Sequence, residues 1–215
     1  MTGILWDLDG TLLDTLEDLK DGVNYAMDAF GYPRRTLDEV RAFVGNGARR
    51  LITLAAPDGA DVDAVLEAFH TYYDVHCQDK TGPYPGVGEA LAELGEKYPM
   101  AIVSNKPDVA VKPLCENWFP GIYARGEGTD CPRKPAPDMV FQTMAMLGVD
   151  SCIYVGDSEV DILTAKNAGV PCLSVLWGFR DRKTLEDAGG ERFCTDPREL
   201  PTVIDAMAEE IANGQ

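Results

Sequence analysis

The sequence contains few basic residues. Its 215 residues include 19 Lys and Arg against 36 Asp and Glu, which gives a formal net charge of −17 at pH 7. Nucleic-acid polymers require a basic face that displaces counterions from phosphates, and anionic membrane surfaces attract basic segments. Both classes of partner are therefore excluded. A small anionic substrate is still compatible, because a few local cations and a metal can reverse the sign of the potential inside one cleft.

Long apolar runs and paired cysteines are also absent. No apolar run approaches the ~20 residues of a membrane-spanning helix. The N-terminal residues include neither a basic segment nor a long apolar core, so we expect no signal peptide. The six cysteines stand singly without a C-x-x-C pair, which predicts reduced thiols in place of disulfides or a zinc site. We therefore expect a cytoplasmic protein. We also expect it to be a monomer or a homodimer.

Short, continuous apolar runs recur along the chain and indicate strands that are buried on both faces. These runs are residues 3–6, 100–103, 152–155 and 173–176, with a last edge strand at 192–194. Helical patterns lie between them, for example at 88–97, 138–147 and 159–169. The alternation of strands and helices predicts an α/β fold with a doubly wound parallel sheet.

One stretch after the first strand breaks this alternation and has mostly helical patterns. Leu16, Leu19 and Val23 begin an apolar stripe at helical spacing, and Thr36-Leu-Asp-Glu39 is a capping-box pattern that starts a second helix. An all-helical insertion at this place predicts a small separate domain. We expect it to span residues 15–81, with a core domain formed by residues 1–14 and 82–215.

Two carboxylates follow the first apolar run, in the segment Asp7-Leu-Asp9-Gly10-Thr11. At positions i and i+2 of an extended chain they project from one side, at the strand end where open α/β sheets bind ligands. Two close like charges are costly unless a cation lies between them. The competing interpretation is a polar turn, because Asp and Gly commonly build turns.

The second and third apolar runs also end in polar residues. Ser104 and Asn105 can donate hydrogen bonds to an anion. Asp157 follows the third run and Asp161 lies one helical turn further, and oxygen ligands at this density suit Mg²⁺. An acidic first turn, favoured by the helix dipole, would also explain them. Lys134 lies in a proline-stiffened loop before a helix.

Together these motifs resemble those of the haloacid dehalogenase superfamily of phosphatases. The segment Asp7-Leu-Asp9-Gly10-Thr11-Leu12 is the signature of that family. Ser104, Lys134 and Gly156-Asp157-Ser158-x-x-Asp161 match its other three motifs, in the family order. The resemblance covers nearly the whole chain. It implies the family's Rossmann-like core and identifies the helical insertion with the family's mobile cap.

The resemblance implies a phosphomonoesterase that acts through a covalent intermediate. Asp7 would be the nucleophile that forms an aspartyl-phosphate. Asp9 would be the general acid for the leaving group and then the general base for water. Ser104 and Lys134 would hold the transferring phosphoryl oxygens.

The resemblance also implies Mg²⁺ as the cofactor, since a carboxylate that attacks a phosphate dianion needs charge neutralisation. The implied ligands are Asp7, the backbone carbonyl of Asp9, and Asp157. Asp161 would orient Lys134 or a water at the metal instead of binding the metal directly.

The helical insertion gives the best clue to the substrate, which we expect to be a small phosphorylated metabolite. The segment from Val44 to Arg50 is a Gly-rich turn that enters a helix, where Gly45 and Arg49 can hold an anionic group. A flexible turn with solvated arginines is the competing interpretation. Together with the Lys134 loop, the segment is similar to phosphoglycolate phosphatases, which makes 2-phosphoglycolate the leading candidate. Thr11 and Asn105 complete the expected substrate-binding residues.

Other activities of the family fit the residues less well or stay open. Dehalogenases lack the second aspartate of the first motif, which is present here as Asp9. Phosphonatases use a cap lysine, but Lys20 lies in an acid-rich helix, and sugar-phosphate mutases commonly have a cap His earlier than His70. The same chemistry on nucleotides, pyrophosphate or sugar phosphates stays open. A non-catalytic regulatory protein with this fold is a further alternative, against which the intact motifs argue.

Overall fold

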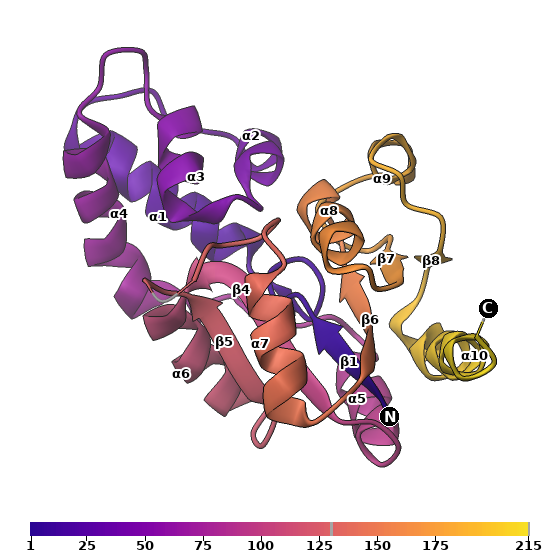
Figure 1. The fold of residues 1–215 in the computed structure, drawn as a ribbon. Helices are drawn as coiled ribbons and strands as arrows, with labels where there is room; N and C mark the ends of the chain where they lie inside the picture. Colours follow the sequence, from indigo (N-terminus) through magenta and orange to yellow (C-terminus); the bar gives the residue numbers. More distant parts are fainter. Residues whose placement is uncertain (130, 215) are drawn as a thin grey trace.

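A six-stranded parallel sheet forms the centre of the molecule. The structure is a computed structural model that describes residues 1–129 and 131–214. The strands are arranged in the order β5-β4-β1-β6-β7-β8 (Figure 1). Their bounds are Thr2–Trp6 (β1), Met100–Pro107 (β4), Tyr123–Glu127 (β5), Ser151–Gly156 (β6), Cys172–Val175 (β7) and Phe193–Cys194 (β8). The predicted parallel α/β fold is confirmed.

Helices cover both faces of this sheet. On one face, Ile4 and Trp6 of β1 pack among residues of α5 (Val87–Gly95), α6 (Asp108–Trp118) and α10 (Leu200–Ala212). On the other face, Leu5 packs against α7 (Asp138–Leu147) and α8 (Glu159–Ala168). The central strand is therefore buried on both sides, which explains its continuous apolar sequence.

The remaining short elements complete the core. Helix α9 (Arg182–Asp187) and the 3₁₀ turn Pro197–Glu199 join the last strands to α10. Within the described residues, the six cysteines form no disulfide, as predicted. Within the part of the chain that the structure describes, no helix is both long and apolar enough to cross a membrane.

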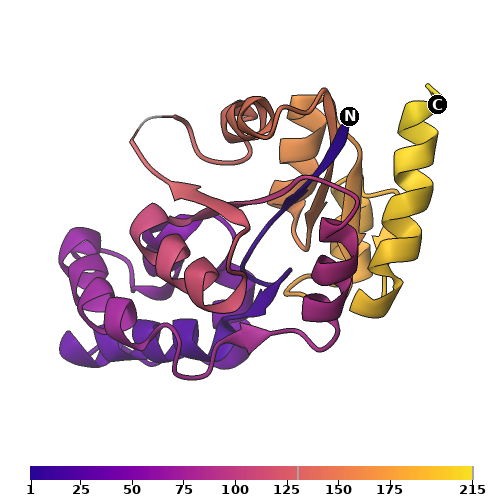
Figure 2. The same ribbon diagram turned by 90° about the horizontal axis from the view of Figure 1, so that it is seen from below.

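Four helices form a group of their own beside the carboxyl end of β1. They are α1 (Leu16–Ala29), α2 (Leu37–Phe43), α3 (Gly47–Ala55) and α4 (Val62–His76). Figure 2 shows them together at one side of the molecule, far from α10. They bury a separate apolar cluster that includes Val23, Ile52 and Phe69. The capping box at Thr36 and Glu39 is present at the start of α2, as predicted.

The chain leaves the core and returns to it through one paired ribbon. Strands β2 (Leu13–Asp14) and β3 (Gly82–Pro83) pair antiparallel. Next to them, the Asp18 carboxylate of α1 is only 3% exposed and accepts hydrogen bonds from the backbone N–H groups of Lys80 and Thr81 at 2.9 to 3.1 Å. The Thr81 hydroxyl donates a further bond of 2.8 Å. Asp18 therefore fastens the returning linker to the first helix of the insertion.

We expect Asp18→Ala to destabilise the protein strongly, because it leaves the buried N–H group and hydroxyl of Thr81 without their acceptor. The loss in free energy of unfolding should be about 2–4 kcal/mol. Urea denaturation at pH 7 measures it. Glu17→Ala is the matched control, since Glu17 lies in the same helical turn and pairs with Lys20 at the surface. Equal stability of the two variants would contradict the role of Asp18.

Candidate active site

Polar side chains from three neighbouring strands meet at the carboxyl edge of the sheet. Asp7 follows β1, Ser104 lies in the last part of β4, and Asp157 follows β6. Strand β1 lies between the other two, so parallel pairing brings the three sequence motifs to one place. All three side chains are buried.

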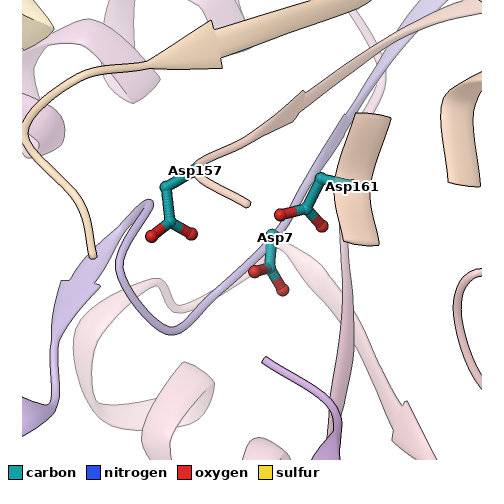
Figure 3. Close-up of side chains that lie close together, drawn as sticks. All are labelled: Asp7, Asp157 and Asp161. Carbon is teal, nitrogen blue, oxygen red and sulfur yellow. The ribbon is translucent and has the colours of Figure 1, made fainter. Parts of the chain in front are cut away.

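Three carboxylates, from Asp7, Asp157 and Asp161, converge at this edge (Figure 3). One oxygen of each lies within 4.8 Å of the others. The pKa of Asp7 is raised to about 7, because burial and then the Asp161 charge raise it by more than the Lys134 ammonium lowers it. Burial, followed by the charges of Asp161 and Asp7, raises the pKa of Asp157 well above its usual value. The cluster thus holds uncompensated negative charge, which a cation would relieve.

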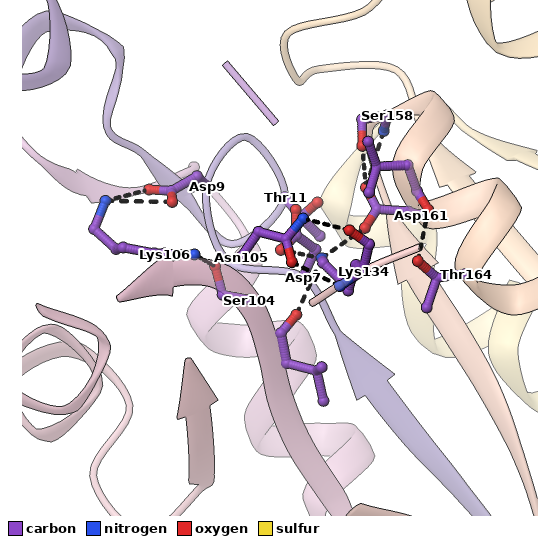
Figure 4. A network of polar contacts seen from close by, with 12 residues as sticks. Asp7, Asp9, Thr11, Ser104, Asn105, Lys106, Lys134, Ser158, Asp161 and Thr164 are labelled. Atoms are coloured by element: carbon purple, nitrogen blue, oxygen red, sulfur yellow. Dashed lines mark hydrogen bonds and ion pairs between the residues drawn. The ribbon is translucent and has the colours of Figure 1, made fainter. Parts of the chain in front are cut away.

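Lys134 is the cation nearest to this cluster and is only 1% exposed. Its Nζ lies 2.8 Å from Asp7 Oδ1 and 2.8 Å from Asp161 Oδ1 (Figure 4). It also donates to the Val103 carbonyl at 3.2 Å and to the Tyr154 hydroxyl at 3.0 Å. Burial alone would lower the pKa of Lys134, but Asp161 and Asp7 outweigh it and the net shift is upward. The side chain therefore stays an ammonium at neutral pH.

The donor set of the cluster fits a divalent cation at two of its three carboxylates. Asp161 uses both oxygens, because Ser158 donates to Oδ2 from its backbone N–H at 3.1 Å and from its hydroxyl at 2.6 Å. Asp157 accepts one hydrogen bond at each oxygen, from Thr11 and Phe179. Among residues 1–129 and 131–214, Asp7 Oδ2 has no hydrogen-bond partner. Asp161 Oδ2 thus accepts two hydrogen bonds, whereas each oxygen of Asp7 and Asp157 accepts at most one from the described residues and keeps a lone pair that a hard cation such as Mg²⁺ can use.

The Asp157 side chain occupies space that a side chain at Gly10 or Gly178 would otherwise fill. A Cβ atom on Gly178 would lie 2.3 Å from Asp157 Cβ and 2.4 Å from the Gly10 carbonyl oxygen. At Gly10, where φ is +85°, a Cβ would lie 2.3 Å from Asp157 Oδ2. Gly10 is thus required both by its backbone conformation and by the close approach of the carboxylate.

The Asp9 carboxylate pairs with Lys106, whereas the Asp7 carboxylate pairs with Lys134. The sequence predicts that both project from one side of an extended strand, but β1 ends at Trp6 and the chain then turns. Asp9 pairs with Lys106 Nζ at 3.0 Å, away from the carboxylate cluster (Figure 4). Lys106 is buried and also donates to Tyr73 at 2.7 Å. The sequence analysis did not identify Lys106 as a site residue. The available signal was its position two residues after Ser104.

A cavity lies between the helices α1–α4 and the carboxyl edge of the sheet. The core lines it with polar residues that include Asp7, Asp9, Ser104, Lys106, Lys134 and Asp157. The four-helix insertion adds a mostly apolar wall with a Gly-rich turn at the start of α3, and the lining residues there include Leu19, Gly45, Gly47, Ala48, Leu51, Phe69 and Tyr73. Both parts of the chain therefore contribute to one site.

Two of the four predicted substrate-binding residues line the cavity and two do not. Gly45 and Asn105 line the cavity, but the Asn105 amide is committed to the backbone of Lys134 and Gly45 at 2.9 to 3.2 Å. Thr11 is fully buried, and its hydroxyl donates to Asp157 instead of reaching the cavity. Arg49 is exposed, pairs with an aspartate of α4 and does not line the cavity. The structure therefore does not bring Thr11 and Arg49 to the expected binding site.

Arg180 is the arginine that the structure brings to the Gly-rich turn. It lines the cavity and bonds Glu159 through Nε at 2.9 Å. Its other nitrogens donate to the backbone carbonyls of Arg41 at 2.8 Å and Val44 at 2.6 Å. No local pattern in the sequence pointed to this residue, because its partners belong to distant segments.

This fold and this cluster of motifs agree with a known enzyme family. A family model described as haloacid dehalogenase-like hydrolase matches residues 4–175. The chain therefore belongs to the haloacid dehalogenase-like hydrolases, and the resemblance identified from the four motifs is confirmed. It is an enzyme of the hydrolase class.

Within this family, the chain is similar to phosphoglycolate phosphatases. It is 35% identical to the one from Pseudomonas syringae pathovar tomato, over 96% of this chain and 81% of the relative. It is 34% identical to the one from Mesorhizobium japonicum, over 97% of this chain and 94% of the relative. A crystal structure of a protein proposed to be a phosphoglycolate phosphatase, from Lactobacillus delbrueckii subspecies bulgaricus, has a TM-score of 0.88 and 36% identity, and covers 94% of this chain and 97% of its own.

We expect Gly178→Ala to destabilise the protein, because the new methyl group must displace Asp157 or the backbone at Gly10. Overpacking of this kind costs about 1–3 kcal/mol. Gly88→Ala is the matched control, since Gly88 lies in α5 and no neighbouring group lies within 4 Å of the place its methyl group would take. That variant should be as stable as the wild type or more stable. Urea denaturation compares the two, and a loss confined to Gly88→Ala would refute the packing at Asp157.

Proposed function

We propose that this enzyme is a phosphomonoesterase that hydrolyses 2-phosphoglycolate through a phosphorylated Asp7. The observation that carries the proposal is the buried Asp7 carboxylate, which opens to a cavity and is held at one oxygen by the Lys134 ammonium. A carboxylate fixed in this way can attack an electrophile with its other oxygen. The similarity to phosphoglycolate phosphatases supports phosphorus as that electrophile.

The reaction has two displacements at phosphorus. In the first, Asp7 Oδ2 forms a bond to phosphorus, the bond to the leaving oxygen breaks, and Asp9 gives that oxygen a proton. In the second, Asp9 takes a proton from water as the water oxygen attacks phosphorus, and the bond to Asp7 breaks to release inorganic phosphate. Lys134 and Ser104 stabilise the equatorial phosphoryl oxygens in both transition states.

Mg²⁺ is the cofactor that this site would use. Asp7 and Asp157 would hold it, together with the backbone carbonyl of Asp9, and Asp161 would keep Lys134 in place. When bound, the ion neutralises negative charge shared by the phosphate and the carboxylates. The uncompensated charge of the cluster supports this assignment.

The carboxylate of the substrate would lie at the other end of the cavity. Gly45 and Gly47 line that end, and Gly47 begins α3, so the positive end of the helix dipole faces the cavity. Arg180 lies beside this turn and adds a positive charge. We assign to Arg180 the role that the sequence predicted for Arg49.

We expect Asp7→Asn to abolish hydrolysis of 2-phosphoglycolate and of p-nitrophenyl phosphate, because the amide is not a nucleophile. The decrease in kcat should exceed about 1,000-fold, as for other residues whose loss removes the reaction path. Far-UV circular dichroism is the control for folding. Substantial activity in a folded variant would rule out Asp7 as the nucleophile.

We expect Mg²⁺ affinity to fall as pH decreases from 8 to 6. The pKa of Asp7 is about 7 without metal, so the ion must displace a proton below this pH, and Asp7 alone should weaken binding about tenfold. Isothermal titration calorimetry measures the affinity. Asp157→Asn should bind much more weakly, whereas Asp9→Asn, which keeps its backbone carbonyl, should bind nearly as well as the wild type. A Mg²⁺ affinity that changes neither with pH nor in Asp157→Asn would contradict the proposed metal site.

We expect Arg180→Ala to raise KM for 2-phosphoglycolate about 10- to 100-fold, since a charged hydrogen-bonding group at the turn is lost. KM for p-nitrophenyl phosphate, which has no carboxylate, should change much less. Arg49→Ala is the matched control and should leave both values unchanged.

A kcat/KM panel with 2-phosphoglycolate, nucleotides, pyrophosphate and sugar phosphates tests the substrate itself. The wild type should prefer 2-phosphoglycolate, and Arg180→Ala should erase that preference. A preference for another ester, or equal effects of Arg180→Ala on carboxylated and neutral esters, would overturn the carboxylate assignment.

A further inference from the structure

A hydrogen-bonded bridge connects the four-helix insertion to Asp9. Lys106 Nζ lies 3.0 Å from Asp9 Oδ1 and 3.3 Å from Asp9 Oδ2, and it donates to the Tyr73 hydroxyl at 2.7 Å. Lys106 comes from β4 of the core, whereas Tyr73 comes from α4 of the insertion. The bridge is therefore built from three separate elements of the chain.

The bridge is buried and packs against α4. Lys106 is 6% exposed and Tyr73 is 3% exposed. The Tyr73 ring stacks on Phe69, with 4.9 Å between the ring centroids, and Lys106 Nζ lies 4.8 Å from the centre of the Tyr73 ring. Neither partner can therefore move without disturbing the packing of α4.

Lys106 is a second buried lysine of the site, and its side chain pairs with Asp9. Lys134 already supplies the cation at Asp7 and Asp161, and the contacts of Lys106 are with Asp9, Tyr73 and its own strand. Removing an ammonium from water is expensive, and an apolar side chain at the same place would avoid that cost. The cost is understandable if Lys106 holds a group that takes part in the reaction.

We propose that Lys106 and Tyr73 are positioning residues that fix the Asp9 carboxylate and connect its placement to the seating of the insertion on the core. This inference rests on the proposed function, in which Asp9 transfers the proton. Lys106 contacts both carboxylate oxygens, which restricts rotation of the Asp9 side chain. Tyr73 in turn restrains Lys106, but only while α4 lies against the core. Proton transfer is thereby tied to closure of the site around the substrate.

The consequence appears in how the rate depends on the leaving group. The parameter kcat/KM covers the steps up to the first irreversible one, which here is departure of the leaving group. A poor leaving group such as phenol needs a proton from Asp9 as the bond breaks, whereas p-nitrophenol leaves readily as an anion. Loss of Asp9 positioning should therefore slow phenyl phosphate far more than p-nitrophenyl phosphate.

The test compares kcat/KM of both aryl esters in the wild type and in Lys106→Met, Tyr73→Phe and Lys106→Arg, each with saturating Mg²⁺. Lys106→Met should lower kcat/KM for phenyl phosphate about 10- to 100-fold, and that for p-nitrophenyl phosphate less than about threefold. Tyr73→Phe, which removes only a hydroxyl group, should show the same selectivity with a smaller loss. Lys106→Arg should restore most of the activity. Lys112→Met is the control, since Lys112 is exposed on α6.

Each outcome decides the inference. Equal losses for both esters, or no loss in either Lys106→Met or Tyr73→Phe, would overturn it, because a purely structural role affects both esters alike. The substrate proposal fails separately: hydrolysis of the aryl esters without hydrolysis of 2-phosphoglycolate contradicts that proposal alone. Activity of Asp7→Asn would contradict the nucleophile, whatever the Lys106 variants show.

Discussion

The ion pairs of Lys134 are the interaction on which the rest of the site depends. Its ammonium lies between the carboxylates of Asp7 and Asp161 in a place that water hardly reaches. Without it, three buried carboxylates would face one another with no ammonium between them. Lys134 can reach this place because the Asn105 side chain holds its backbone at both the N–H and the carbonyl group. The same amide contacts Gly45 of the insertion.

The remaining features accommodate this concentration of charge. Gly10 and Gly178 leave space for Asp157, and Thr11 and the loop after β7 give its oxygens hydrogen bonds. The four-helix insertion then closes the site with an apolar wall, which lowers the local dielectric constant and strengthens every charge interaction inside. An acidic protein can thus bind a phosphate ester, because the anion meets a few buried cations instead of the average surface potential.

The sequence was sufficient to predict the features that depend on residues adjacent in the chain. Buried strands have continuous apolar runs, and three of the four family motifs lie at the end of one, so the central sheet and its charged edge could be predicted. Edge strand β5 was missed because Tyr123–Glu127 is polar and half-exposed. Lys106 and Arg180 were missed because their partners lie in other elements. Arg49 lies in the expected Gly-rich segment, yet it pairs with Asp63 on the surface.

Detection of the phosphorylated enzyme tests the central claim most directly. The Asp9→Asn variant should accumulate it with p-nitrophenyl phosphate, since this ester needs no proton for departure, whereas the second displacement needs the Asp9 base. Acid quenching within one turnover, followed by peptide mass spectrometry, should locate a phosphoryl group on Asp7. A phosphoryl group on another residue, or release of both products in one step with no phosphorylated enzyme, would contradict the account.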